Sequence, residues 1–178
     1  MMKLKQVAAT FFLGAGLLLS GCSSDESIVQ NGTLNFDSSV TLSDAFDNYE
    51  FFSDSDWSSF EDRQNRQFVE FVGNINIDAH EGTSIPSMGI EVTEEILEKS
   101  KENFPDDLEL DLKVQFKISK VDDSFEIHRI FMTIRGTNMK TGEYGEADTP
   151  LQMDAIESVY SNVPILGVFG LIHNAGSQ

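Results

Sequence analysis

The residues best suited to chemistry in this chain are its three histidines and its many carboxylates. His80, His128 and His173 stand far apart, without the spacing of metal ligands. Glu81 follows His80, but the second histidine of a zinc-protease motif is missing from the sequence. The sequence also has no Gly-x-Ser-x-Gly nucleophile elbow and no glycine-rich phosphate loop. This pattern favours histidines with a structural or solvated role over catalytic or metal-binding ones.

The acidic side chains form several clusters, one of which surrounds the only tryptophan. Asp54, Asp56, Glu61 and Asp62 flank Trp57 within one short segment. We predict that these five residues form a surface that binds a cationic partner, because charge complementarity favours such an encounter. Trp57 and the phenylalanine three residues later could instead stack on a sugar. Core packing is the favoured role for the tryptophan, since one face of each strand must be buried.

Two other uses of the carboxylates remain open. A hydrolase that works through acids predicts that Asp56, Glu61 and Glu70 converge in one pocket. Weak calcium binding would need the regular loop spacing with a central glycine, which none of the clusters has. We therefore predict no metal, no cofactor and no catalytic residue, with a carboxylate- or metal-dependent envelope hydrolase as the alternative.

The N-terminus has the layout of a secretory signal. Lys3 and Lys5 precede an apolar run over 7–19, which ends in small residues at Ser20 and Gly21. The run is too short for an ordinary membrane span, which needs about 20 apolar residues. The only cysteine, Cys22, follows immediately.

The motif Leu19-Ser20-Gly21-Cys22 resembles the lipobox of bacterial lipoprotein precursors. The resemblance implies that residues 1–21 are removed and that Cys22 is acylated, which would anchor the protein to a membrane. Several acyl chains on one residue would make that anchor stable, whereas a single chain binds only marginally. In the Gram-negative family an aspartate after the cysteine retains the protein in the inner membrane. Ser23 therefore implies sorting to the outer membrane, with the domain facing the periplasm.

The chain is strongly acidic, with 12 basic and 30 acidic residues and a formal net charge of −18 among 178 residues. Cleavage after Gly21 would remove two lysines and no acid, so that the charge would become −20. Such a charge excludes nucleic acid as a partner and opposes anionic lipid headgroups, because both would be repelled. It permits a cationic protein and also keeps a tethered domain soluble.

The remaining chain predicts one domain. Residues 22–33 are polar and lack an apolar period, which predicts a flexible linker after the lipidated cysteine. Residues 34–178 are long enough for a single hydrophobic core. Thr41 and Asp44 resemble a capping box at the start of a short helix, and the segment 51–78 predicts two strands joined around 63–66.

The second half of the domain predicts a similar order. Thr93 can cap a helix that ends before Pro105, and apolar residues then alternate from Leu108 to Ile118 in the clearest strand of the chain. In the returning strand the apolar residues change parity around His128-Arg129. This change predicts a β-bulge, or else a strand buried on both sides.

The last part of the chain predicts a loop over 137–148 and a helix that starts at Thr149 with Pro150 in its first turn. The apolar tail over 163–172 either packs on the core, adds a strand or binds a partner. The fold class is therefore α+β. We expect a four-stranded antiparallel sheet in two hairpins, with about three helices packed on one face.

Part of the domain, roughly residues 40–135, resembles small uncharacterised bacterial envelope lipoproteins. The matching residues are Phe46, Tyr49, Trp57, Phe60, Val69, Phe71, Gln115, Phe116, Phe125, Glu126 and Ile127. Those proteins usually have glycine in the first hairpin turn, where this chain has Asn65, which also tolerates a left-handed backbone. The architecture is also similar to envelope proteins of the β-lactamase-inhibitor-like class, which bind other proteins through the sheet.

Function is therefore expected to be a lipid-anchored, non-enzymatic binding or assembly module, with a cationic envelope protein as its partner. An inhibitor or a scaffold subunit would both fit this description. A purely structural lipoprotein without a specific ligand also remains open.

Overall fold

The computed structural model describes residues 24–85 and 89–178. The predicted signal sequence over 1–21, the lipobox-like motif and Cys22 lie outside the described residues. The main sheet is antiparallel and has the strand order β1-β2-β5-β6-β7. Its strands are β1 (Phe52–Glu61), β2 (Gln67–Ile75), β5 (Glu109–Ser119), β6 (Ser124–Thr137) and β7 (Tyr144–Pro150).

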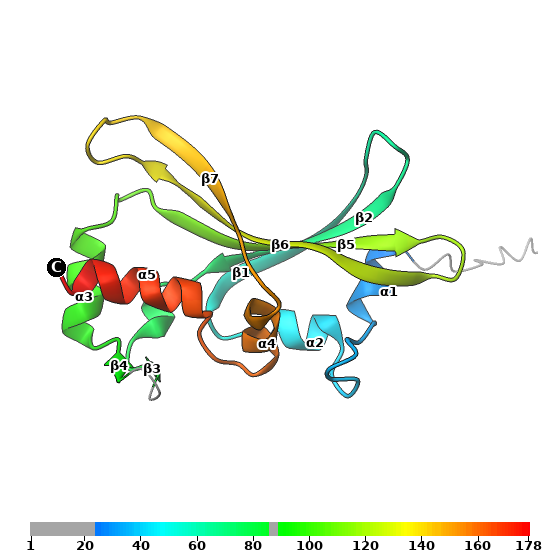
Figure 1. Ribbon diagram of the computed structural model, residues 1–178, viewed down its shortest axis with the longest axis horizontal. Helices are drawn as coiled ribbons and strands as arrows, with labels where there is room; N and C mark the ends of the chain where they lie inside the picture. The colour runs from blue at the N-terminus through cyan, green and yellow to red at the C-terminus, as the bar shows by residue number, and fades with distance from the viewer. Residues whose placement is uncertain (1–23, 86–88) are drawn as a thin grey trace, which may run out of the picture.

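The helices gather on one side of this sheet, as Figure 1 shows. They are α1 (Asp25–Gln30), α2 (Leu42–Phe46), α3 (Glu94–Glu102), α4 (Asp154–Tyr160) and α5 (Leu166–Gly176). A short 3-10 helix η1 (Asp78–His80) and a small ribbon of β3 (Ser84–Ile85) and β4 (Ile90–Glu91) connect β2 to α3. The α+β class and the antiparallel sheet are confirmed. The expected strand count is wrong, because the main sheet has five strands. About three helices were expected, and the described residues form five α-helices, of which α3, α4 and α5 have seven residues or more.

The core lies between the helices and the inner face of the sheet. Phe71, Val114 and Phe116 are fully buried on neighbouring strands, and Phe46 of α2 packs edge-to-face on Phe71 with ring centroids 4.7 Å apart. Phe169 of α5 is also buried, so the apolar tail forms a helix that packs on the core. Of the three alternatives for the tail, packing on the core is the one observed.

Close contact between α3 and α5 depends on a glycine. A Cβ atom at Gly176 would lie 2.0 Å from the backbone oxygen of Ile96, so no larger residue fits without a shift of one helix. The side chain of Asn103 also donates to the carbonyl oxygen of Ala175 at 2.9 Å. These contacts fix the end of the chain against α3.

Several local predictions are confirmed. Thr41 Oγ1 accepts from the backbone N–H of Asp44 at 3.1 Å, and Thr93 Oγ1 accepts from that of Ile96 at 3.3 Å. The turn between β1 and β2 places Asn65 at a positive φ of 59°, the left-handed conformation that asparagine tolerates.

The predicted β-bulge is also present. Gln115 pairs with Arg129, but the next residue, Phe116, pairs with Ile127. His128 is therefore the extra residue, and it shifts the parity of β6. Phe131 consequently lies on the opposite face of the sheet from the core residue Met132.

We expected a flexible linker over 22–33, but the described part of this segment contains the helix α1. Ser24 caps α1, and Val29 on this helix is completely buried. Gly32 lies directly against the ring of Phe125, at the start of β6. One apolar pair, Ile28 and Val29, was too short to show a helical period, but its burial under the sheet orders this segment.

The end of the sheet differs from the prediction as well. Residues 144–150, expected to be loop and the start of a helix, form the edge strand β7 and pair with Phe131–Thr137. Pro150 is the last residue of that strand, and α4 begins only at Asp154, without a side-chain cap. An edge position tolerates proline, glycine and charged residues, because one side of the strand needs no partner.

Candidate functional site: the uncovered face of the sheet

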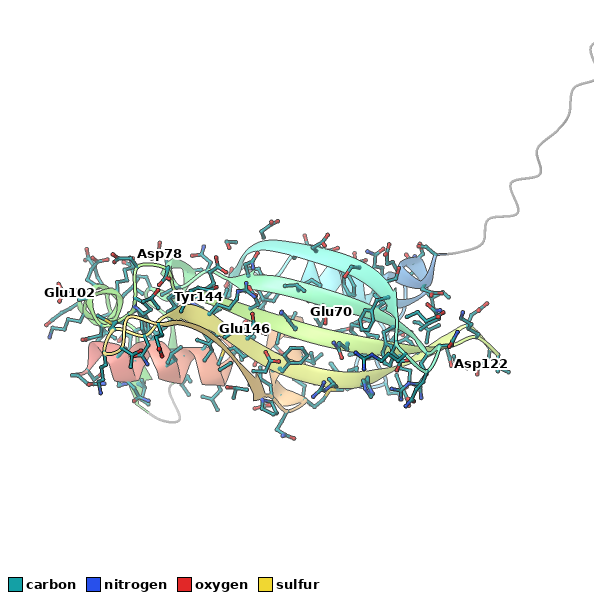
Figure 2. The ribbon with its side chains drawn as sticks, turned by 90° about the horizontal axis from the view of Figure 1, so that it is seen from above. Glu70, Asp78, Glu102, Asp122, Tyr144 and Glu146 are labelled. Carbon is teal, nitrogen blue, oxygen red and sulfur yellow. The ribbon has the colours of Figure 1, made fainter. Side chains whose placement is uncertain are left out.

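One face of the main sheet carries no helix among the described residues, as Figures 1 and 2 show. We call it the uncovered face. The strand register places alternate residues on it, namely Asp54, Asp56, Ser58, Phe60, Phe68, Glu70, Val72, Asn74, Glu109, Asp111, Lys113, Gln115, Lys117, Glu126, Arg129, Phe131, Thr133, Arg135, Glu146, Asp148 and Pro150. This face is the largest candidate surface for a partner.

A buried carboxylate organises the middle of the uncovered face. The side chain of Asp111 is only 2% exposed and lies 2.6 Å from Arg135 Nη2. Asn74 donates a hydrogen bond to the same carboxylate. The Nε of Arg135 also reaches Glu109 at 2.9 Å, so one guanidinium holds two acids on adjacent rows. Because these acids raise the pKa of Arg135 above its usual value, the guanidinium stays charged.

Aromatic and basic side chains occupy one end of the face, beside the β1–β2 turn. Phe60 and Phe68 stack with centroids 5.3 Å apart, and the His128 ring lies 5.1 Å from Phe68. Arg66 lies over the Phe68 ring at 5.4 Å. These contacts bury Phe68, whereas Phe60 stays 39% exposed. The bulge at His128 brings its ring to this cluster.

Unpaired acids lie mainly on the two edge strands. Asp54 and Asp56 of β1 and Glu146 of β7 have no salt bridge to another residue in the described ranges. In the central strands, by contrast, Lys117 pairs with Glu126 at 3.0 Å, and Gln115 donates to Glu70 at 2.7 Å. The negative charge that remains available to a partner therefore follows the edges of the sheet.

The five residues predicted as a partner surface are divided between the two sides of β1. Asp54 and Asp56 are exposed on the uncovered face, whereas Trp57 faces the helices. The Trp57 Nε1 donates to Asp47 Oδ1 at 2.9 Å, and its ring lies 4.8 Å from that of Phe71. Trp57 therefore packs on the core and is unavailable for a sugar or a partner on the acidic face.

The other two predicted residues lie at the β1–β2 turn. Asp62 accepts from the backbone N–H groups of Gln64 and Arg66, each at 2.9 Å, and from Arg66 Nε at 2.7 Å. The Arg66 side chain lowers the pKa of Asp62 below its usual value. Glu61 bonds to the amide of Gln67. These two acids shape the turn, so Asp62 is largely committed to the fold.

The three acids of the hydrolase alternative do not meet in one pocket. Asp56 and Glu70 share the uncovered face, but they belong to different rows, opposite Val72 and Ser58 respectively. Glu61 has the parity of Trp57 and belongs to the other side. In the described part of the chain no three His, Cys, Asp or Glu residues have a geometry that could hold a metal ion.

The histidines occupy three unrelated environments. His80 is buried, and its Nδ1 lies 2.9 Å from the carbonyl oxygen of Asn76, to which the neutral ring donates. Burial lowers the pKa of His80, while this hydrogen bond partly opposes the shift. His128 is exposed at the bulge, and His173 lies near the end of α5.

Sequence reasoning missed the acids of β7, because that segment has no apolar alternation. A turn signal was nevertheless present. Asn138 accepts from the backbone N–H groups of Lys140 and Thr141, and Gly142 adopts a positive φ of 71°. A tight turn of this type directly after a strand predicts a hairpin, and the hairpin requires a returning strand.

No family model, curated protein or solved structure matches this chain. Within the described residues, none of the helices is both long enough and apolar enough to cross a membrane.

Proposed function

We propose that this protein is a lipid-anchored protein of the bacterial cell envelope that binds a cationic protein partner through the uncovered face. In this proposal Cys22 carries the acyl chains and holds the domain at the outer membrane, facing the periplasm. The protein acts as a binding or assembly module, without a cofactor and without nucleic acid. The motif Leu19-Ser20-Gly21-Cys22 is the support for the anchor.

The observation that carries the binding function is the uncovered face with its acidic edges. A sheet that packs helices on one side only leaves its other side for solvent or for a partner. Asp54 and Asp56 on one edge strand and Glu146 on the other offer unpaired carboxylates. Phe60 on β1 and Phe131 on β6 add apolar area to the same face, which contributes more to affinity than exposed charge does.

The charge pattern also defines the partner more closely. Lys113 and Arg129 lie near the middle of the uncovered face, between the acidic edges. A partner with basic residues at its rim and polar or acidic groups at its centre would complement this arrangement. A uniformly basic partner would meet repulsion at Lys113 and Arg129.

Crosslinking in intact native cells tests the proposal. A photo-reactive amino acid replaces Asp56 on the uncovered face or, as the control, Glu157 on the exposed side of α4. We expect one stoichiometric adduct from position 56, none from position 157, and loss of the adduct when Cys22→Ala removes the anchor. The double change Asp54→Asn with Asp56→Asn should weaken a crosslink placed at Val72 on the same face.

Each part of the proposal can fail separately. Wild-type protein that is soluble and unacylated in native cells would refute the anchor. Equal crosslinking from positions 56 and 157, or none from either while the protein is bound to the membrane, would refute binding through the uncovered face.

A further inference from the structure

A groove lies beneath the β6–β7 hairpin, on the side of the sheet that faces the helices. Figure 1 shows the hairpin rising away from α3 and α5, with the chain after α3 between them. The groove has a volume of about 590 Å³ and is lined by Pro105 and Leu108 on one side and by Ile134 and Ala147 of the hairpin on the other. Ile134 and Ala147 are paired across the two strands, so they form an apolar floor.

Small side chains keep this groove open. On the same face of the hairpin, the next cross-strand pair after Ile134 and Ala147 is Gly136 with Gly145. A Cβ atom at Gly136 would lie 3.2 Å from the Pro105 side chain, so the groove is closed at this point. A Cβ atom at Gly145 would meet nothing within 4 Å. The groove therefore has unfilled space on the β7 side, where an incoming side chain could enter.

The surroundings of the groove are acidic. Glu143 lines it beside the hairpin turn, and Glu146 borders it on β7 with its side chain on the uncovered face. Glu102 and Asp106 line the adjoining hollow beside Met139. Of the nearby cations, Lys140 lines the groove and has no salt bridge in the described ranges, whereas Lys101 and Arg135 are engaged within the fold. Lys101 pairs with Asp78 at 2.7 Å and with Glu98 at 3.0 Å. Arg135 pairs with Glu109 and Asp111. An incoming basic segment would thus find carboxylates without ion-pair partners in the described ranges.

The outer edge of β7 adds a backbone template to the groove. In the described part of the chain β7 pairs only with β6, and every residue of β7 is exposed. Half of the N–H and C=O groups of an edge strand point outward and can bind an added strand. Side chains of such a strand would alternate between the groove and the uncovered face.

We propose that the β7 edge binds an extended basic segment of the partner, with apolar and basic residues in alternation. The apolar side chains enter the groove beside Gly145 and Ala147, and the lysines or arginines lie over Glu146 and Glu143. The inference rests on the proposed function and specifies where on the sheet the partner docks and which chemical pattern it presents.

A synthetic probe tests this docking mode with the purified domain. The fluorescein-labelled peptide Lys-Val-Lys-Leu-Lys-Val-Lys carries the expected pattern. The peptide Lys-Ser-Lys-Ser-Lys-Ser-Lys has the same charge without the apolar side chains, and Glu-Val-Glu-Leu-Glu-Val-Glu has the opposite charge. In fluorescence anisotropy we expect saturable binding of the first, at least fivefold weaker binding of the second and no binding of the third.

Matched variants then locate the site. Gly145→Leu fills the groove and should weaken the first peptide at least fivefold, whereas Gln152→Leu adds an exposed leucine elsewhere and should leave its Kd within twofold. Glu143→Gln with Glu146→Gln should weaken binding at least threefold. Glu94→Gln with Glu157→Gln removes the same charge from α3 and α4 and should change it less than twofold. Circular dichroism and thermal unfolding confirm that each variant is folded.

The possible results distinguish a wrong docking position from a wrong proposed function. Equal weakening by the two charge variants, no effect of Gly145→Leu, or no binding of the first peptide would overturn the docking mode. If the in-cell crosslink from position 56 persisted in any of these cases, the proposed function would stand and only the docking position would be wrong. If that crosslink were also absent, both would fail.

Discussion

Asp111 shows how a residue on an apparently wet face can become buried. The alternation of β5 places Asp111 among polar residues that should face water, together with Lys113 and Gln115. In the folded sheet Asn74 and Arg135, from strands far apart in the sequence, close over its carboxylate. The same carboxylate fixes Arg135 beside Glu109, and thereby leaves Glu146 on β7 without that cation.

Removal of the guanidinium should destabilise the protein through this buried charge. Arg135→Leu leaves the Asp111 carboxylate without its cation, which is expected to lower the free energy of unfolding by about 3 kcal/mol. Lys117→Leu, which breaks an exposed pair with Glu126, should cost at most about 1 kcal/mol. Urea unfolding measures both. Equal losses would show that Asp111 is effectively solvated.

His80 should make stability depend on pH below neutrality. Burial lowers its pKa in the folded state, so the unfolded chain binds a proton more readily. Stability from the neutral ring is complete above the unfolded pKa of about 6.5 and is lost as the pH falls below it. Between pH 7.5 and 5.5 the wild type should lose about 1 kcal/mol more than His80→Phe.

The control for this prediction is a surface substitution that leaves His80 in place. Val121→Ala should have the same pH dependence as the wild type in urea unfolding, because it changes an exposed side chain that does not titrate. The reduced repulsion among the acids at lower pH affects all three proteins alike and cancels in the comparison. A wild type with the pH dependence of His80→Phe would contradict the prediction.

At the level of elements, α1 and β7 are among those that local sequence did not reveal. Neither has enough apolar residues to show a period. Helix α1 is held because Val29 enters the core between α2 and the sheet, and β7 is held because the long strand β6 offers an unpaired edge. Tertiary contacts therefore supply the stability that local propensity lacks.

Truncation of Val29 tests whether α1 belongs to the fold. Val29→Ala should lower the free energy of unfolding by about 2 kcal/mol, because it leaves a cavity in a completely buried site. Val121→Ala makes the same chemical change in the β5–β6 turn, where the side chain is 96% exposed, and should cost less than about 0.5 kcal/mol. If both cost equally little, α1 would not be part of the cooperative domain.

At the level of the whole molecule, the start of the fold determines how an anchored domain would sit. Ser24 caps α1 only two residues after Cys22, and two residues of extended chain span at most about 7 Å. Helix α1 and the end of α5 lie at opposite ends of the long axis in Figure 1. An acylated Cys22 would therefore hold the α1 end at the bilayer and leave the groove beneath the β6–β7 hairpin farther from it.

Fluorescence quenching can measure this orientation. A fluorophore attached to a cysteine at Asp25 of α1, in acylated protein on vesicles with nitroxide-labelled headgroups, should be strongly quenched. The same fluorophore at Asn174 of α5 should be quenched much less, because the length of the domain separates it from the membrane. Equal quenching at the two sites would show that the domain lies flat on the bilayer or moves freely about its anchor.

Elements with strong local patterns could be predicted from the sequence alone. The alternation from Leu108 to Ile118, the caps at Thr41 and Thr93 and the parity change at His128 are all set by neighbours in the chain, and each was predicted correctly. The lipobox-like motif Leu19-Ser20-Gly21-Cys22 is also local, but it lies outside the described residues and the anchor stays a prediction.

Which acids are available to a partner depends on the tertiary structure. In the folded protein Trp57 packs on the core, Asp62 is hydrogen-bonded within a turn, and Asp111 is buried. Glu146 lies on the fifth strand of the sheet. These outcomes depend on strand order, register and the packing of helices on one face, which join residues distant in sequence. Composition states how many carboxylates the chain has, but the environment of each one is fixed only when the sheet is assembled.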